Sequence, residues 1–381
     1  MIQIIDKNNC CGCEACVQVC PKGCIDFTMD TEGFYYPHVN VDDCVSCGMC
    51  EKVCPMLNPC GKQKSISVYG AFNKNEEVRK HSSSGGIFTL LAEKVLDDGG
   101  VVFGAKFDKN WDVVYAPVFN KKDLCLLRGS KYVQARVGNN YKLCKEYLDH
   151  NRKVLFTGTP CHISGLLHFL RRDYDNLLTC DVFCHGVPSP GVWNRYLSEV
   201  AGKGRDTIER IDFRNKKSGW KNYSVVIKTQ SNTLRAPYRE NPYMRAFLND
   251  LILRPSCYSC KSKEGRSHSD ITIADFWGIE HLHPEIDDDK GISLVLLNTN
   301  KGVAFFETIE SHYVFASFLP SAVEYNPAYI YSAELNKNRE VFFRGLADNT
   351  SMEIIVNKAL HKSTIIRLKI FVRRIIAKLF R

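Results

Sequence analysis

One spacing of cysteines occurs twice in the first sixty residues and restricts this segment more than any other feature. Each run reads C-x2-C-x2-C-x3-C-P, with the cysteines at Cys10, Cys13, Cys16 and Cys20 and again at Cys44, Cys47, Cys50 and Cys54. Eighteen cysteines would suggest disulfides in a small secreted domain. No hydrophobic signal segment precedes Cys10, so we expect reduced, metal-binding thiols in a cytoplasmic protein.

The doubled run is typical of bacterial ferredoxins with two [4Fe-4S] clusters, in which the fourth cysteine of each run binds the other cluster. Three thiolates two residues apart wrap one corner of a cubane, and the proline ends the loop. The spacing therefore predicts one cluster on Cys10, Cys13, Cys16 and Cys54 and a second on Cys44, Cys47, Cys50 and Cys20. Two zinc sites are the alternative, because four cysteines also bind zinc. Cys11 and Cys24 lie off the spacing and are predicted to be buried thiols without a ligand role.

The net charge of +9 is unevenly distributed along the chain. Residues 1–60 carry three Lys and eight Asp or Glu, which gives −5, whereas residues 354–381 carry eight Lys or Arg and no acid, which gives +8. The acidic first segment predicts a docking surface for a redox partner protein with a basic patch. Without the basic C-terminal segment the chain is nearly neutral, so we expect no nucleic-acid partner.

The sequence after Lys62 alternates between helical and strand patterns. This predicts an α+β or α/β protein in which a small ferredoxin-like domain at 1–60 precedes a larger mixed α/β domain at 61–350. A serine-capped helix that stops at Gly-Gly is predicted at 81–100. Further helices are predicted at 161–170 and 189–200, and strands at 101–107, 153–158, 176–183, 208–214, 223–229, 269–276 and 291–298. No G-x-G-x-x-G follows a strand, so a standard Rossmann dinucleotide site is not expected.

Two loops of the larger domain have the composition of a phosphate-binding turn. Residues 82–86 (SSSGG) precede the predicted helix, where free backbone N–H groups attract an anion. Residues 157–160 (TGTP) follow a strand at its C-terminal end, where open α/β sheets bind ligands. Serine caps and glycine turns are also common without a ligand, and ordinary turns are the alternative.

A second cysteine pattern lies far along the chain. Cys257 and Cys260 form a C-x-x-C pair that needs two more ligands to complete a metal site. Cys161 and Cys184 follow predicted strands, and they lie at one edge of the sheet if those strands are parallel neighbours. A structural zinc site, a redox-active dithiol and a nucleophilic Cys161 beside His162 are the alternatives.

Several segments carry a resemblance to a known family, in that family's order. Besides the doubled cysteine run they are "SSSGGIFTLLA", "GSKYVQA" (129–135), "LFTGTPCHISGL" (155–166), "DVFCHGVPSPGVW" (181–193), "FRNKKSGW" (213–220) and "LRPSCYSCKSKEGRSHSDITIADFWG" (253–278). The chain resembles the coenzyme F-420 hydrogenase/dehydrogenase beta-subunit family over about residues 1–300. Residues 301–381 carry no such resemblance.

The resemblance implies an iron–sulfur flavoprotein oxidoreductase that moves electrons between [4Fe-4S] clusters, FAD and an unidentified substrate. It implies a third cluster, with the ligands Cys161, Cys184, Cys257 and Cys260. It also implies a set of flavin contacts: Ser83, Ser84, Gly85, Gly86, Ser130, Lys131, Thr157, Gly158 and Thr159. A flavin stores two electrons and passes them on as hydride, which single-electron clusters cannot do. No catalytic acid or base is predicted.

The basic C-terminal segment, residues 351–381, is predicted to be an amphipathic helix. Its apolar face and its positive charges suit an anionic membrane surface, and a helix docked on the body is the alternative. Nothing in the sequence identifies coenzyme F-420 as a ligand. The doubled ferredoxin run and this helix fit the polysaccharide-biosynthesis branch of the family, with a small-molecule or lipid-linked substrate at the inner membrane surface. A non-catalytic electron-transfer subunit and a zinc-stabilised binding protein are the alternative functions.

Overall fold

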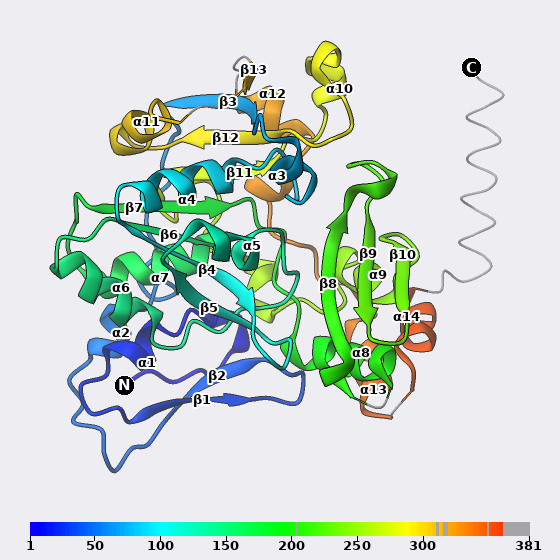
Figure 1. The fold of residues 1–381 in the computed structure, drawn as a ribbon. Coiled ribbons are helices and arrows are strands. Elements are labelled where there is room, and N and C mark those ends of the chain that lie inside the picture. Colours follow the sequence, from blue (N-terminus) through cyan, green and yellow to red (C-terminus); the bar gives the residue numbers. More distant parts are fainter. Residues whose placement is uncertain (203, 310–311, 315–318, 349, 361–381) are drawn as a thin grey trace, which may run out of the picture.

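The computed structural model describes residues 1–360 except 203, 310–311, 315–318 and 349 (Figure 1). The N-terminal unit contains an antiparallel hairpin and two short helices: β1 (Ile25–Met29), β2 (Tyr35–Val39), α1 (Ala15–Val19) and α2 (Met49–Lys52). Glu14 and Gly48 precede the two helices at equivalent positions of the doubled run, and both have positive φ, 61° and 69°. The segment 351–381, predicted to be an amphipathic helix, is described only in its first part, which forms α14 (Met352–Leu360); residues 361–381 lie outside the described residues.

An eight-stranded mixed sheet forms the large domain, in the order β13-β3-β12-β11-β7-β6-β4-β5. Its central strands are parallel neighbours: β11 (Ile271–Asp275), β7 (Leu177–Val182), β6 (Val154–Gly158) and β4 (Val101–Phe107). The outer strands pair antiparallel: β5 (Val113–Val118), β12 (Ser293–Leu297), β3 (Ser67–Phe72) and β13 (His312–Val314). The predicted mixed α/β class is confirmed.

Helices cover both faces of this sheet, because successive side chains of a strand point to opposite sides. Val102, Leu155 and Leu178 belong to one buried cluster with residues of α4 (Ile87–Asp97) and α5 (Leu124–Leu127). Their neighbours along the strands, among them Phe103 and Phe156, belong to a second cluster with residues of α6 (Asn140–Asp149) and α7 (Pro160–Leu170). The N-terminal unit lies below α6 and α7 in Figure 1 and contributes to this second cluster.

A three-stranded antiparallel sheet stands beside the main sheet (Figure 1). It consists of β8 (Ile208–Asn215), β9 (Ser224–Thr229) and β10 (Thr233–Pro237). The helices near it are α8 (Pro190–Ala201), α9 (Pro242–Leu248), α13 (Arg339–Ala347) and α14 (Met352–Leu360). Shorter helices are α3 (Glu76–Lys80), α10 (Ile279–Leu282), α11 (Asn300–Phe306) and α12 (Leu319–Glu324). Among the described residues no helix has the length and apolarity needed to cross a membrane.

The predicted serine cap of the helix at 81–100 is wrong. The helix, α4, begins at Ile87 after Gly86, which has a φ of 85°, and no side chain caps it. The three serine hydroxyls bind residues of other segments: Ser82 bonds to the carbonyl of Val78, Ser83 to the hydroxyl of Ser130 and Ser84 to the carbonyl of Ile292. Glycine takes the cap position because the left-handed conformation there is strained for other residues.

The N-terminal unit packs closely against the large domain. The backbone N–H of Gly191 in α8 donates to the carbonyl of Gly33 at 3.1 Å, and a Cβ on Gly33 would lie only 2.5 Å from the Gly191 Cα. Arg339 in α13 donates two hydrogen bonds to Glu32, at 2.5 and 2.6 Å. These contacts join the hairpin of the N-terminal unit to two helices of the large domain.

A buried carboxyl group in β7 predicts a pH-dependent stability. Asp181 is 3% exposed, and its Oδ1 is buried without a hydrogen-bond partner in the described part of the chain. Burial raises its pKa from 3.8 to about 6. The folded state therefore binds this proton more tightly than the unfolded state, and the resulting stability is lost as the pH rises through 6.

From pH 5 to pH 8 the natural chain should lose about 1.4 kcal/mol of unfolding free energy through Asp181. The Asp181→Asn variant should not show this loss, so the difference between the two proteins should grow by that amount. The reason is that asparagine carries no charge to bury at the higher pH. Urea unfolding of both proteins at the two pH values measures the change. An equal difference at both values would show that the Asp181 pKa is not raised.

Candidate functional site

The eight cysteines of the doubled run line two separate small cavities, in the grouping that the spacing predicts. We call the first set the inner cysteines: Cys10, Cys13, Cys16 and Cys54. We call the second set the outer cysteines: Cys20, Cys44, Cys47 and Cys50. Cys11 also lines the inner cavity and Cys24 the outer one. Each cavity thus holds one additional buried thiol that the spacing does not count as a ligand.

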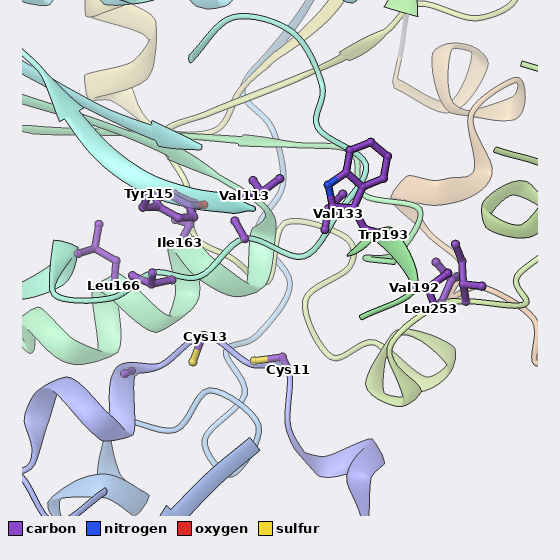
Figure 2. Close-up of a cluster of buried hydrophobic side chains, with 14 of the residues drawn as sticks. Cys11, Cys13, Val113, Tyr115, Val133, Ile163, Leu166, Val192, Trp193 and Leu253 are labelled. Carbon is purple, nitrogen blue, oxygen red and sulfur yellow. The ribbon is translucent and has the colours of Figure 1, made fainter. Parts of the chain in front are cut away.

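The inner cysteines face the large domain. A Cβ on Gly165 of α7 would lie 2.9 Å from the Cβ of Cys13 and 3.1 Å from its Sγ, so this glycine permits the close approach. The thiol of Cys11 interacts with the thiols of both Cys13 and Cys161. Figure 2 shows Cys11 and Cys13 on their loop below α7, opposite Ile163 and Leu166. The first repeat of the doubled run therefore packs closely against α7 of the large domain.

Glu14 explains why the two repeats differ at one position. It is 3% exposed, and its carboxylate accepts from Arg136 at 2.6 Å and from the backbone N–H groups of Val137 and Gly138. Positive φ strains a non-glycine residue, but a carboxylate here ties the inner loop to the large domain. The outer repeat has Gly48 at the equivalent position, and its Cys47 is exposed.

Four later cysteines gather at the carboxyl ends of the central strands. Cys161 follows β6 and Cys184 follows β7, and the two strands are parallel neighbours. Cys257 lies in the 3-10 helix Pro255–Ser259, and Cys260 directly follows it. We call this set the core cysteines: Cys161, Cys184, Cys257 and Cys260. From the sequence, Cys161 and Cys184 were expected to lie at one edge of the sheet if their strands were parallel neighbours, and β6 and β7 are.

The core cysteines are half-buried and lie near one another. Burial raises the pKa of Cys184 to about 12, and the neighbouring Cys161 and Cys260 add to this rise. Burial also raises the pKa of Cys257, with further contributions from Cys184 and Cys260. Buried thiols that oppose each other's ionisation lose their protons when a cationic centre binds them.

A site for a single metal ion needs its ligands closer together than a site for a cluster does. Among the described residues, no three His, Cys, Asp or Glu side chains are grouped as the ligands of one metal ion. A [4Fe-4S] cubane holds its four thiolates around a body of eight atoms, so its ligands are not grouped as those of one ion. The donor set of four neighbouring, half-buried thiols fits such a cluster.

A cavity of about 540 Å³ opens beside the core cysteines. This volume lies within the range of small-molecule and cofactor sites. Eight of the nine predicted flavin contacts line it: Ser83, Ser84, Gly86, Ser130, Lys131, Thr157, Gly158 and Thr159. Gly85 is not among the lining residues, because it packs against the backbone of β3 and β12, and a Cβ there would lie 2.5 Å from the carbonyl of Ala71. Cys184 and His185 line the cavity as well.

Lys131 serves the structure as well as lining the cavity. Its ammonium donates to the carbonyls of Leu127, Arg128 and Gly129, at 3.0 to 3.1 Å, and so caps the end of α5. Burial lowers its pKa from 10.5 to about 7. An anion in the cavity would favour the charged form of this side chain.

A buried ion pair forms another part of the cavity wall. Arg214 of β8 donates to both oxygens of Asp275 at the end of β11, at 3.0 and 3.2 Å, and Trp220 donates to the same carboxylate at 3.1 Å. The Nε of Arg214 is buried without a partner among the described residues, although the side chain lines the cavity. Trp277 stacks on Trp220 with 4.5 Å between ring centres. The wall therefore presents a guanidinium and aromatic rings.

Comparison with known proteins assigns most of the chain to two parts of one family. Two family models, for the N-terminal and the C-terminal part of the coenzyme F420 hydrogenase/dehydrogenase beta subunit, match residues 68–139 and 151–317. A "4Fe-4S dicluster domain" matches residues 9–57. The chain belongs to this beta-subunit family. The beta-subunit resemblance is thus confirmed, and the protein is an iron–sulfur electron-transfer protein of a redox family.

Individual relatives of this beta-subunit protein are distant. An uncharacterised protein of Methanocaldococcus jannaschii is 23% identical, in a match that covers 80% of this chain and 88% of the relative. One subunit of the F(420)H(2) dehydrogenase of Methanosarcina mazei is 21% identical over 42% of this chain and 48% of its own length, so the match spans about half of that relative. A chain of the F420-reducing [NiFe] hydrogenase complex from Methanosarcina barkeri has 18% identity and a TM-score of 0.46, covering 66% of this chain and 83% of that chain.

Sequence reasoning did not predict the ion pair in the cavity wall of this beta-subunit protein. Arg214 carries no signal of its own, and Asp275 and Trp277 close a predicted strand, where the indole could stack on a ring or fill the core. His185, beside Cys184, is hydrogen-bonded through Nε2 to Asp250 at 2.6 Å. The nucleophile alternative loses its base, since the ring of His162 is 2% exposed, binds the Tyr115 hydroxyl at 3.0 Å and has a pKa lowered to about 4 by burial.

Proposed function

We propose that this chain is an iron–sulfur flavoprotein oxidoreductase. In this proposal the inner and outer cysteines hold two [4Fe-4S] clusters, the core cysteines hold a third and FAD occupies the large cavity. The observation that carries it is the continuity of the sites. The Cys11 thiol interacts with Cys13 of the inner set and Cys161 of the core set, and Cys184 of the core set lines the cavity.

The residues of the cavity fit a flavin dinucleotide. Serine and threonine hydroxyls and the backbone before α4 offer hydrogen bonds to phosphate. The unpaired Nε of Arg214 offers a further donor, and Trp277 and Tyr223 offer aromatic surface in the same wall. A flavin, when bound, exchanges single electrons with iron–sulfur clusters and two electrons with an organic substrate.

The protein's own residues then have distinct roles. Arg214 and Lys131 supply positive charge to an anionic cofactor or substrate. His185, held by its hydrogen bond to Asp250, places a polar ring in the cavity wall beside Cys184. The core cysteines would hold a cluster between the inner cysteines and the cavity, since Cys161 interacts with Cys11 and Cys184 lines the cavity.

The surface around the outer cysteines supports a role in docking a redox partner. Cys47 is exposed, and the neighbouring Val41 and Val45 are 60% and 57% exposed. Asp42 and Asp43 lie between these two valines and are exposed. An apolar centre with acidic neighbours suits a small electron carrier that has a basic rim. The branch of the family, its polysaccharide or lipid-linked substrate and the membrane contact stay predictions.

Anaerobic purification followed by measurement of iron, zinc and flavin tests the proposal. We expect about twelve irons, no zinc and one FAD per chain, since three cubanes hold four irons each. About eight irons with no flavin would contradict the proposed third cluster and favour an electron-transfer subunit that serves a separate enzyme. About eight irons with one zinc would favour a zinc-stabilised binding protein.

A further inference from the structure

Arg254 is a buried cation at the boundary between the inner cysteines and the core cysteines. Its side chain is fully buried, with 0% exposure, and a guanidinium stays charged at every accessible pH. Among the described residues no carboxylate forms an ion pair with it, and its acceptors are the carbonyl of Cys10, the carbonyl of Tyr35, Oε1 of Gln134 and Sγ of Cys10. A buried charge without a counter-charge is costly.

The missing counter-charge lies at the inner cysteines. Nη2 of Arg254 is 3.3 Å from the Sγ of Cys10, and Nε donates to the carbonyl of the same residue at 2.6 Å. The guanidinium also lies over the ring of Tyr36, with 4.2 Å to the ring centre. Gln134, which accepts from Nη1 at 2.9 Å, donates to the carbonyl of Cys11. The orientation of Arg254 is thus fixed from several sides toward one cluster ligand.

The backbone of Arg254 belongs to the other site. Its N–H donates to the carbonyl of Val187, and its carbonyl accepts from the N–H of Cys257, a core cysteine, at 2.9 Å. The outer cysteines have a different surrounding, in which Cys50 accepts from the neutral backbone N–H of Ile2 at 3.3 Å. Arg254 therefore touches the inner set with its charge and the core set with its backbone.

We infer that Arg254 is a positioning residue that raises the reduction potential of the inner cluster and fixes that cluster against the core cysteines. This inference rests on the proposed function, because it requires a cluster on the inner cysteines. Reduction adds a negative charge to the cluster, and a buried cation beside a ligand sulfur stabilises that charge more than the oxidised state. Hydrogen bonds to the ligand sulfurs are among the established determinants of such potentials.

Redox titration followed by electron paramagnetic resonance, on the full chain with its clusters, tests the inference. In the Arg254→Gln variant we expect the equilibrium constant for one-electron reduction of the inner cluster to fall about tenfold, which is about 59 mV. The Arg254→Lys variant keeps the positive charge, so its equilibrium constant for reduction of the inner cluster should fall by less. The inner signal is the ferredoxin-type signal that remains in a Cys47→Ala background, which lacks an outer ligand.

Two internal comparisons make the result specific. The reduction potential of the outer cluster should not change, since the outer cysteines line a separate cavity. The Arg339→Gln variant removes an arginine that joins the same two parts of the chain through Glu32 and touches no cysteine in its hydrogen bonds, so it should leave both potentials unchanged. An inner potential that stays the same in Arg254→Gln would overturn the inference.

The experiment separates this inference from the proposed function. If the natural chain carries no inner cluster, the proposed function has failed before any variant is made. If Arg254→Gln purifies without iron, the inference is tested with the Gln134→Met variant instead. This variant removes the acceptor that orients the guanidinium of Arg254. A lowered inner potential in Gln134→Met supports the inference, and an unchanged one contradicts it.

Discussion

Replacing Cys257 with alanine is expected to lower the iron content of the anaerobically purified chain from about twelve to about eight atoms. Cys257 is a half-buried member of the core cysteines, and the other three members cannot complete a cubane without it. The two ferredoxin clusters should persist, because their cavities are lined by residues 1–56 alone. Iron analysis and the absorption of the iron–sulfur chromophore measure the loss.

The Cys144→Ala variant provides the matched control for this result. Cys144 is also a buried thiol of the large domain, 0% exposed on α6, and it lies outside all three cysteine sets. Its removal should leave about twelve irons and should cost only the packing of one small side chain. An iron content that does not change in Cys257→Ala would remove the third cluster from the proposed function, because the core cysteines would then be ordinary buried thiols.

The inner and outer grouping of the cysteines could be predicted because it depends on local spacing. Three thiols at intervals of three residues must lie on one turn of chain, and the crossed fourth ligand follows from the doubled run. The central strands were also predictable, since β4, β6 and β7 each begin with two or three consecutive apolar residues, followed by glycine or threonine. The meeting of Cys161 and Cys184 needed one further fact, the parallel pairing of β6 with β7.

The parts that could not be predicted depend on contacts between distant segments. Arg254 reaches Cys10, which lies 244 residues earlier, and Arg214 reaches Asp275 across 61 residues. The serines at 82–84 have the composition of a cap, but the hydroxyls of Ser83 and Ser84 bind Ser130 and Ile292, which only the fold brings near. No local pattern distinguishes such an arginine or serine from one that simply faces solvent.

Neutralising Asp275 is expected to lower the free energy of unfolding by about 3–5 kcal/mol, because it leaves Arg214 as an uncompensated buried charge. The side chains of Arg214 and Asp275 are 5% and 18% exposed. In Asp275→Asn the shape of the side chain and an acceptor for Trp220 remain, so the change is one of charge. The double variant Arg214→Met, Asp275→Asn should lose less unfolding free energy than the Arg214→Met and Asp275→Asn variants lose together. Urea unfolding of the three variants measures this.

The effect of added FAD on stability shows whether the positive charge of Arg214 also binds an anion in the cavity. If an anionic cofactor binds beside Arg214, FAD should stabilise Asp275→Asn more than the natural chain, since the cofactor then replaces the lost counter-charge. The control is Asp288→Asn, which breaks the bidentate pair of buried Arg79 with Asp288, at 2.7 Å; neither residue of this pair lines the cavity. That variant should also lose stability, but FAD should stabilise it no more than the natural chain. Equal stabilisation of both variants by FAD would place the anionic part of the cofactor away from Arg214.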